Sequence, residues 1–246
     1  MAKSHPNKPV IRFRDAHIVV VEKPPGLTTM RHAHEAAEFG SRGRRYLPAT
    51  LADVLTGQLG GKVRAVHRLD NETSGLVVFA RTVASERDLG KQFRAHSVER
   101  CYLAVVRGRG RSQRIESWLL RDRGDGRRGS SVTPGEGQRA ISHVRVVENF
   151  GDFTLVECRL ETGRTHQVRI HLGEAGTPIC GDHIYDRPLH GRPLPDNSGI
   201  SRIALHAATL GFRHPETGKR MHWNSELPAD MKELLKRVRP PANRPR

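Results

Sequence analysis

Two short runs of β-branched and apolar residues constrain the fold of this chain more than any other feature. Residues 17–22 read HIVVVE and residues 75–81 read GLVVFAR. Uninterrupted apolar runs of this length, bounded by polar residues, are typical of short strands that are buried on both faces. The chain is therefore expected to place these two segments inside a sheet.

Further extended segments and two helices complete the predicted pattern. Thr50 and Asp53 resemble a capping box at the start of one helix, and Pro228 is expected to open another helix with one apolar face. Strands are also expected at residues 100–107, 141–149 and 153–160. This mixture indicates the α+β (mixed α/β) class, in which a sheet packs against helices.

The length and the polar segments indicate one domain. A chain of 246 residues can bury one large core. We expect an N-terminal extension at residues 1–16, the main domain at residues 17–238 and a basic tail at residues 239–246. Segments rich in Arg, Gly or Ser are expected to be mobile loops at residues 31–45, 107–113 and 121–138.

The charge of the chain indicates a polyanionic partner. Lysine and arginine exceed the acidic residues so far that the formal net charge is +16. Basic surfaces bind nucleic acids by releasing condensed counterions, and this contribution is independent of base sequence. Charge alone therefore does not separate an RNA enzyme from a passive RNA binder. The chain has no apolar run that could span a bilayer and no secretory signal, so a cytoplasmic location without membrane contact is expected.

Neither the cysteines nor the histidines form a metal-binding pattern. Cys101, Cys158 and Cys180 lie far apart and contain no CxxC pair, so buried, reduced thiols are expected. His166 and His171 are five residues apart, which separates them by about 140° around a helix and puts them on different faces. We therefore expect no metal.

The stretch HRLDNETSGL, residues 67–76, is the first candidate for chemistry. It lies between two strand-like segments and presents Asp70 before small hydroxyl residues and a glycine. A tight, hydrogen-bonded loop of this kind could hold the carboxylate at the edge of a strand. An ordinary Asx turn, with Arg68 as a solvated neighbour, explains the same residues.

The stretch ETGRTHQVRIHL, residues 161–172, is the second candidate. Thr165 could cap a helix in which Val168 and Leu172 share one face, although the alternating apolar residues would also fit a strand. In the helical case Arg164 precedes the helix and could pair with an acid such as Asp70. Such a pair would lower the pKa of the aspartate by roughly 1 to 3 units and keep it ionised.

These two stretches carry a family resemblance. The segment HRLDNETSGLVVFA at residues 67–80 is similar, almost residue for residue, to the first signature of the RluA-type pseudouridine synthases, and GRTHQVRIHL at residues 163–172 is similar to the second. Weaker similarities, in the family's order, are EKPPGL at residues 22–27, YLAVVRG at residues 102–108, GTPICGDHIYD at residues 176–186 and LHAATLGFRHPETG at residues 205–218.

The resemblance implies a fold, a reaction and roles for five residues. The implied fold is a central, mostly antiparallel mixed sheet flanked by helices and basic loops, with an RNA-binding cleft. Asp70 would attack the uracil ring or ribose C1′, so that uridine in structured RNA (rRNA or tRNA) becomes pseudouridine without a cofactor or metal. Tyr102 would stack on the uracil and assist removal of the C5 proton, and Arg164 would hold Asp70. Arg68 would fill the space left by the extruded nucleotide, and Leu205 would pack against the flipped base.

Two positions depart from the family's pattern. Asp186 stands where the family usually has glycine, and Met30 with Arg31 replaces the usual end of the segment that begins at residue 22. The shapes of these two loops are therefore left open. We expect the catalytic domain itself to grip the RNA, as a monomer.

Two alternative functions remain beside the synthase. A noncatalytic RNA-binding or RNA-chaperone protein could keep the same fold, but the presence of Asp70, Tyr102 and Arg164 argues against it. A glycosidase using Asp70 and Glu72 would need paired carboxylates, and the strongly basic chain does not suit neutral sugars.

Overall fold

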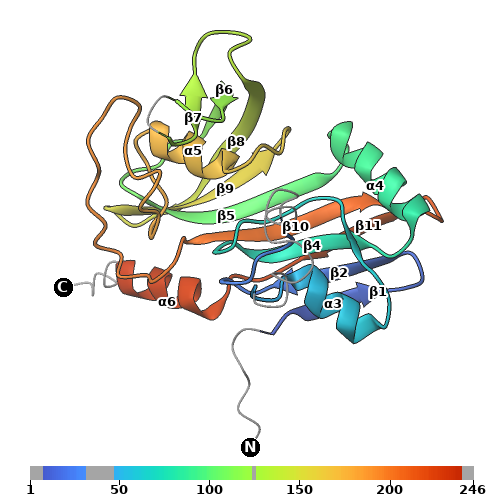
Figure 1. The fold of residues 1–246 in the computed structure, drawn as a ribbon. Coiled ribbons are helices and arrows are strands. Elements are labelled where there is room, and N and C mark those ends of the chain that lie inside the picture. Colours follow the sequence, from blue (N-terminus) through green and yellow to red (C-terminus); the bar gives the residue numbers. More distant parts are fainter. Residues whose placement is uncertain (1–7, 32–46, 124–125, 240–246) are drawn as a thin grey trace, which may run out of the picture. The chain divides into compact units, whose positions relative to one another are not determined.

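The computed structural model describes residues 8–31, 47–123 and 126–239. The chain divides into two compact units, the first made of residues 1–98 and 209–225 and the second of residues 99–208 and 226–246. Each unit thus contains two separate stretches of sequence (Figure 1). The expected boundaries at residues 17 and 238 stay a prediction. The basic loop expected at residues 31–45 and the tail at residues 239–246 lie almost wholly outside the described residues.

The first unit is built on antiparallel strands. Strand β1 (Val10–Arg14) pairs with β2 (Ile18–Lys23), and β2 pairs with β4 (Ser74–Ala80), so that Val19 lies opposite Phe79. The short β3 (Arg64–Ala65) also pairs with β4. Strand β11 (Arg220–Asn224) pairs with residues 209–213 of β10 (Leu205–Arg213), whose first four residues are counted in the second unit. Every residue of β4 is buried, which confirms that the two apolar runs form internal strands.

Two helices belong to the first unit. Helix α3 (Leu51–Leu59) begins with the predicted capping box, because Thr50 and Asp53 bond reciprocally through their side chains and backbone amides. Helix α4 (Val83–Arg94) packs against β3 and β4 and was not among the predicted elements. Its buried residues are only Ser85 and Leu89, and its sequence is mostly polar, so few apolar residues mark this helix.

The second unit is an antiparallel sheet in which the strand order is β5-β9-β8-β6-β7. The predicted strands are confirmed, and two more are found. The bounds are β5 (Glu99–Arg107), β6 (Gln113–Leu120), β7 (Gly129–Ser131), β8 (Gln138–Asn149) and β9 (Phe153–Leu160). Strand β7 lies inside the segment expected to be a mobile loop at residues 121–138, so that expectation is wrong for residues 129–131.

Two helices complete the second unit. Helix α5 (Gln167–Glu174) packs against β8, and helix α6 (Ala229–Val238) follows Pro228 as predicted. The helical interpretation of residues 167–174 is therefore confirmed over the strand. The prediction that Thr165 caps α5 is wrong: the N-cap residue is His166, and Thr165 is exposed.

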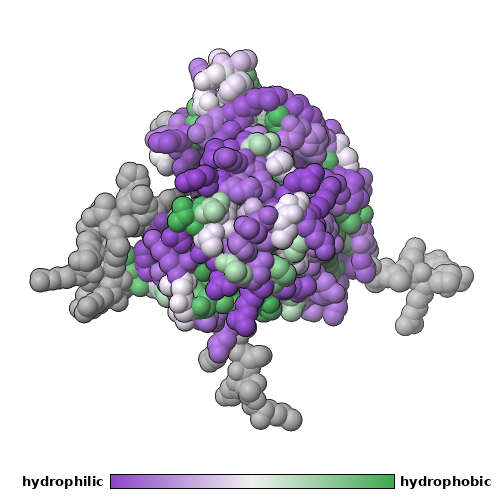
Figure 2. Space-filling view, turned by 90° about the vertical axis from the view of Figure 1, so that its right-hand side faces the viewer, coloured by the Kyte–Doolittle hydropathy of each residue, from purple (hydrophilic) through white to green (hydrophobic). Residues whose placement is uncertain are grey.

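Both units place helices against mostly antiparallel strands, which confirms the α+β class. On the face shown in Figure 2, hydrophilic residues cover most of the described surface and hydrophobic residues appear only in small groups. This surface suits a partner that is bound through polar and charged contacts. Within the described residues, no helix has the length and apolar character to cross a membrane, and no three potential ligands cluster around a metal position.

Removing the cap of α3 should destabilise the protein. Thr50 is buried, and its hydroxyl accepts a hydrogen bond from the backbone of Asp53. We expect Thr50→Ala to lower the free energy of unfolding by about 1 kcal/mol, because a helix amide loses its acceptor. Chemical denaturation measures this change. Gln58→Ala, an exposed substitution in the same helix, serves as the control, and an equal loss in both variants would contradict the role of the cap.

Candidate active site

Asp70 lies in a tight loop between β3 and β4. The residue is partly buried, and its backbone carbonyl accepts a hydrogen bond from the amide of Thr73 at 3.2 Å. The preceding Leu69 is buried, with 3% of its surface exposed. The buried leucine and the backbone turn together fix the backbone position from which the Asp70 carboxylate projects.

A buried lysine holds the far side of this loop. Lys23, at the end of β2, is 0% exposed. Its ammonium group donates to the carbonyls of Pro24, Leu27 and Asn71 at 2.9, 2.8 and 2.8 Å. A buried charge is costly unless each of its protons finds an acceptor. Lys23 therefore fixes the carbonyl of the residue next to Asp70 relative to β2.

Thr29 fixes the near side of the loop in the same manner. Its hydroxyl donates to the carbonyl of Leu69 at 2.8 Å and accepts from the amide of Leu69 at 3.1 Å. Asn71 adds hydrogen bonds from its side chain to Gly26 and Thr28. The segment that carries the weaker EKPPGL similarity thus holds the loop that presents Asp70.

The loop begins at a histidine that packs on α4. The ring of His67 stacks on Phe93 with a centroid distance of 4.4 Å, and its Nε2 accepts from the amide of Val78 at 3.0 Å. Arg68 follows and is partly buried. The structure therefore brings Arg68 and Asp70 together in one anchored loop of the first unit.

The other three predicted site residues belong to the second unit. Tyr102 lies on β5, is partly buried and packs against the core of this unit. Leu205 begins β10, and it is itself part of that core, with 3% of its surface exposed. Arg164 lies in the turn between β9 and α5. The pairing of Arg164 with Asp70 involves residues of different units and stays a prediction.

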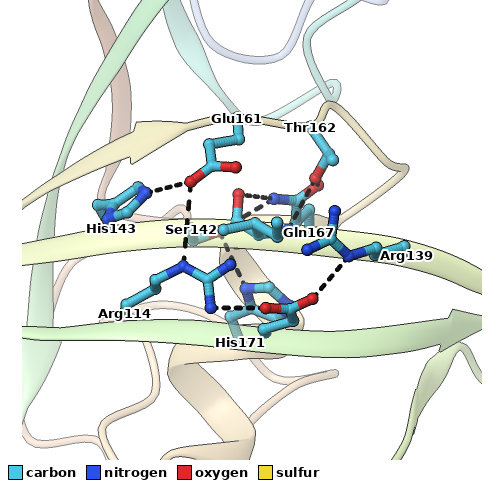
Figure 3. A network of polar contacts seen from close by, with 10 residues as sticks. Arg114, Arg139, Ser142, His143, Glu161, Thr162, Gln167 and His171 are labelled. Carbon is cyan, nitrogen blue, oxygen red and sulfur yellow. Dashed lines mark hydrogen bonds and ion pairs between the residues drawn. The ribbon is translucent and has the colours of Figure 1, made fainter. Parts of the chain in front are cut away.

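The position of Arg164 depends on the buried amide of Gln167. The Oε1 atom of Gln167 accepts from the hydroxyl of Thr162 at 2.7 Å and from the backbone amide of Arg164 at 3.0 Å. Its Nε2 donates to the carbonyl of Ile141 and the hydroxyl of Ser142 on β8. All four hydrogen-bonding positions of the amide are used. The turn that carries Arg164 is therefore tied to β8 through Gln167, which Figure 3 shows with Thr162 and Ser142.

The guanidinium group of Arg164 is oriented by a second contact. Its Nε donates to the backbone carbonyl of Arg139 on β8 at 3.1 Å. With the backbone amide and Nε both fixed, the terminal nitrogens of the guanidinium point in a defined direction. Such pre-orientation is what a residue needs if it is to hold a reacting carboxylate.

A neutral histidine extends the buried network. His171 lies with Nδ1 2.9 Å from the hydroxyl of Ser142 and with Nε2 3.0 Å from that of Ser117 (Figure 3). Burial lowers the pKa of His171 to about 4, so the ring is uncharged at neutral pH. The network therefore stabilises the turn through neutral hydrogen bonds.

Charged residues line the exposed side of the same strands. Glu116 on β6 pairs with Arg114 and Arg139 at 2.5 and 2.6 Å, and Glu161 lies 2.5 Å from His143 (Figure 3). These side chains are between one third and about half exposed, so each pair contributes little to stability. Their proximity to β8 nevertheless surrounds the turn with charged groups.

The loop after α5 supports the other side of this turn. His166 has a φ of 58°, a left-handed conformation that is uncommon for residues other than glycine, and its Nδ1 lies 2.8 Å from the hydroxyl of Tyr185. Arg169 forms a buried ion pair with Asp182 at 2.7 Å and lies over the Tyr185 ring. Asp186, which departs from the family's pattern, pairs with its neighbour Arg187.

Sequence reasoning did not identify the supporting residues Lys23, Thr29 and Gln167. A lysine at the end of a strand is ordinarily predicted to be exposed. The hydrogen bonds of Thr29 and Gln167 reach segments 40 and 26 residues away, which no local pattern reveals. The only available signal was the position of Lys23 and Gln167 inside the motifs.

The buried histidine should make stability depend on pH. The ordinary pKa of histidine is near 6.5, whereas that of His171 is about 4. Between these values the unfolded chain binds a proton that the folded protein does not, so stability falls as the pH is lowered through this range. We expect His171→Asn to reduce the slope by up to about 1.4 kcal/mol per pH unit.

Denaturation from pH 7 to pH 4 measures this slope. His183→Asn, which replaces an exposed histidine, serves as the control and should retain the wild-type slope. Parallel curves for wild type and His171→Asn would contradict the assignment of His171 as a buried, neutral ring.

Known proteins share both the sequence and the fold. The family model described as RNA pseudouridylate synthase matches residues 17–174. Ribosomal large subunit pseudouridine synthase D of Zymomonas mobilis is 40% identical over 233 residues, which cover 92% of this chain and 71% of that protein. The protein of the same name from Pseudomonas aeruginosa is 37% identical, with coverage of 93% and 71%.

Solved structures give the same result for the fold. Human RNA Pseudouridylate Synthase Domain Containing 4 superimposes with a TM-score of 0.70 at 22% identity, covering 93% of this chain and 92% of that one. Human RNA Pseudouridylate Synthase Domain Containing 1 has a TM-score of 0.67 at 22% identity, with 97% of each chain covered. With these matches, the RluA-type resemblance is confirmed, and the chain belongs to the RNA pseudouridylate synthase family of enzymes that isomerise uridine in RNA.

Proposed function

We propose that this enzyme isomerises uridine in the RNA of the large ribosomal subunit and that Asp70 is its nucleophile. The names of the relatives support the choice of RNA. The role of Asp70 is supported by the hydrogen bonds on both sides of its loop: Lys23 binds the carbonyl of the following residue and Thr29 that of the preceding residue. A ribosomal substrate would also agree with the expected cytoplasmic location.

The proposed chemistry needs only the side chains of this chain. The Asp70 carboxylate attacks the uracil ring or ribose C1′, and the N1–C1′ bond breaks. After the base rotates, C5 bonds to C1′ and the bond to Asp70 breaks, which frees the carboxylate. The C5 proton passes to Tyr102 and from there to solvent, while N1 takes a proton from solvent. A covalent intermediate divides one difficult step into two easier ones. Arg164 keeps Asp70 ionised by pairing with it.

The remaining predicted residues prepare the substrate. A stacked base cannot react in place, so it leaves the stack at a cost of a few kcal/mol. Stacking on Tyr102 returns roughly 1 to 3 kcal/mol. Arg68 fills the space left behind, and Leu205 packs against the flipped base. The positive charge of the chain supplies affinity for the phosphates.

Replacing the nucleophile should abolish turnover and leave binding intact. We expect Asp70→Asn to lose tritium release from [5-³H]uridine-labelled RNA by a factor of at least about 10³, because the amide is a far poorer nucleophile, while RNA affinity stays near that of the wild type. Large-subunit ribosomal RNA and tRNA, each from cells lacking the gene, are assayed separately. Glu72→Gln, an exposed carboxylate in the same loop, is the matched control.

Each other outcome overturns part of the proposal. Undiminished release by Asp70→Asn removes Asp70 from the mechanism. Tritium release from tRNA and not from ribosomal RNA would show that the substrate is tRNA. Free uracil among the products would indicate a glycosidase. Tight RNA binding without release by the wild type supports the noncatalytic alternative.

Removing only the hydroxyl of Tyr102 should separate stacking from proton transfer. Tyr102→Phe keeps the aromatic ring, so RNA affinity should change little. Loss of a positioned proton acceptor should slow single-turnover product formation by about 10²- to 10⁴-fold. A wild-type rate in this variant would show that the hydroxyl takes no part in the reaction.

A further inference from the structure

A second arginine lies beside Tyr102 and Arg164. Arg100 is on β5, two residues before Tyr102, and both are partly buried. Side chains two residues apart on a strand project from the same side. The strand therefore places the guanidinium of Arg100 on the side from which Tyr102 projects.

A missing side chain makes room for this guanidinium. A Cβ atom on Gly163 would lie 3.3 Å from Cζ of Arg100, and Nη1 of Arg100 would be closer still. Any residue with a Cβ would therefore displace the end of the Arg100 side chain. Gly163 directly precedes Arg164, so Arg100 lies against the turn that carries the proposed catalytic arginine.

The three groups interact electrostatically. Burial lowers the pKa of Arg100 below its ordinary value, the negative charge of an ionised Tyr102 acts in the opposite direction, and the positive charge of Arg164 lowers it further. Attraction is mutual, so a positive Arg100 favours the ionised form of Tyr102. In a partly buried site this attraction is stronger than in water.

We propose that Arg100 is a positioning residue that stabilises the ionised oxygen of Tyr102 while this oxygen removes the proton from C5. The C5–H bond breaks, the proton passes to the Tyr102 oxygen, and the electron pair of the bond returns to the uracil ring. The phenol then releases the proton to water. This inference rests on the proposed function of Tyr102 as the proton acceptor.

The test compares turnover of RNA that carries hydrogen or deuterium at C5 of uridine. If Arg100 acts on proton removal, Arg100→Gln slows that step selectively, so turnover falls by at least about tenfold and the deuterium isotope effect rises above the wild-type value. Arg100→Lys keeps the charge and should recover most of the turnover. Arg159→Gln removes an exposed arginine from the same unit and is the matched control, expected to keep the wild-type isotope effect.

A steric variant gives an independent measurement. Gly163→Ala leaves every charge in place and displaces Arg100, so it should raise the isotope effect in the same direction. In the Arg100→Gln background the additional alanine should have no further effect on it, because the displaced group is already gone. A further rise of equal size in the double variant would overturn the inference.

The outcomes separate this inference from the proposed function. Tritium release by the wild type together with an unchanged isotope effect in Arg100→Gln overturns the role of Arg100 alone. Equal impairment of Arg100→Lys and Arg100→Gln does the same, since charge would then not matter. Absence of release by the wild type overturns the proposed function and the inference with it.

Discussion

The buried ammonium group of Lys23 is the constraint on which the first unit depends. This group is withdrawn from water and donates to three backbone carbonyls. Two of the carbonyls lie within four residues of Lys23, and the third, that of Asn71, lies 48 residues further along the chain. Losing one acceptor would leave part of a charge without a partner in the interior. The loop that carries Asp70 is therefore restricted to positions in which the carbonyl of Asn71 accepts a hydrogen bond from Lys23. The placement of the proposed nucleophile thus depends on the hydrogen bonds of a buried lysine that takes no part in the proposed reaction.

The second unit uses a neutral group for the same purpose. The amide of Gln167 accepts and donates two hydrogen bonds each, and its contacts reach β8, the preceding turn and, through Ser142, the ring of His171. A fully satisfied amide in the interior tolerates few alternative arrangements. A turn with a strained His166 thereby remains ordered, although the turn itself is short and polar.

Much of this structure could be predicted from the sequence, for identifiable reasons. The strands β2 and β4 were evident because both faces are apolar, and α3 was evident because its cap is local. Helix α4 was missed because only two of its residues are buried, and β7 because its three residues, one glycine and two serines, carry no pattern. The cap of α5 was wrongly assigned to Thr165 because the hydrogen bonds that define this turn come from Gln167 and β8, and long-range contacts leave no mark on local sequence. The candidate residues were found through motifs, whereas their supports depend on the fold.

The division of the chain has a consequence for synthesis on the ribosome. Early residues of the first unit require late ones: Asp15 bonds to His214, Gln92 to Arg213 and Glu22 to Ser225. The nascent chain must therefore expose β2 and β4 for as long as it takes to translate more than half of the protein. These two apolar strands are prone to misassociation during that interval, so ribosome-associated chaperones would be needed most before residue 225 has emerged.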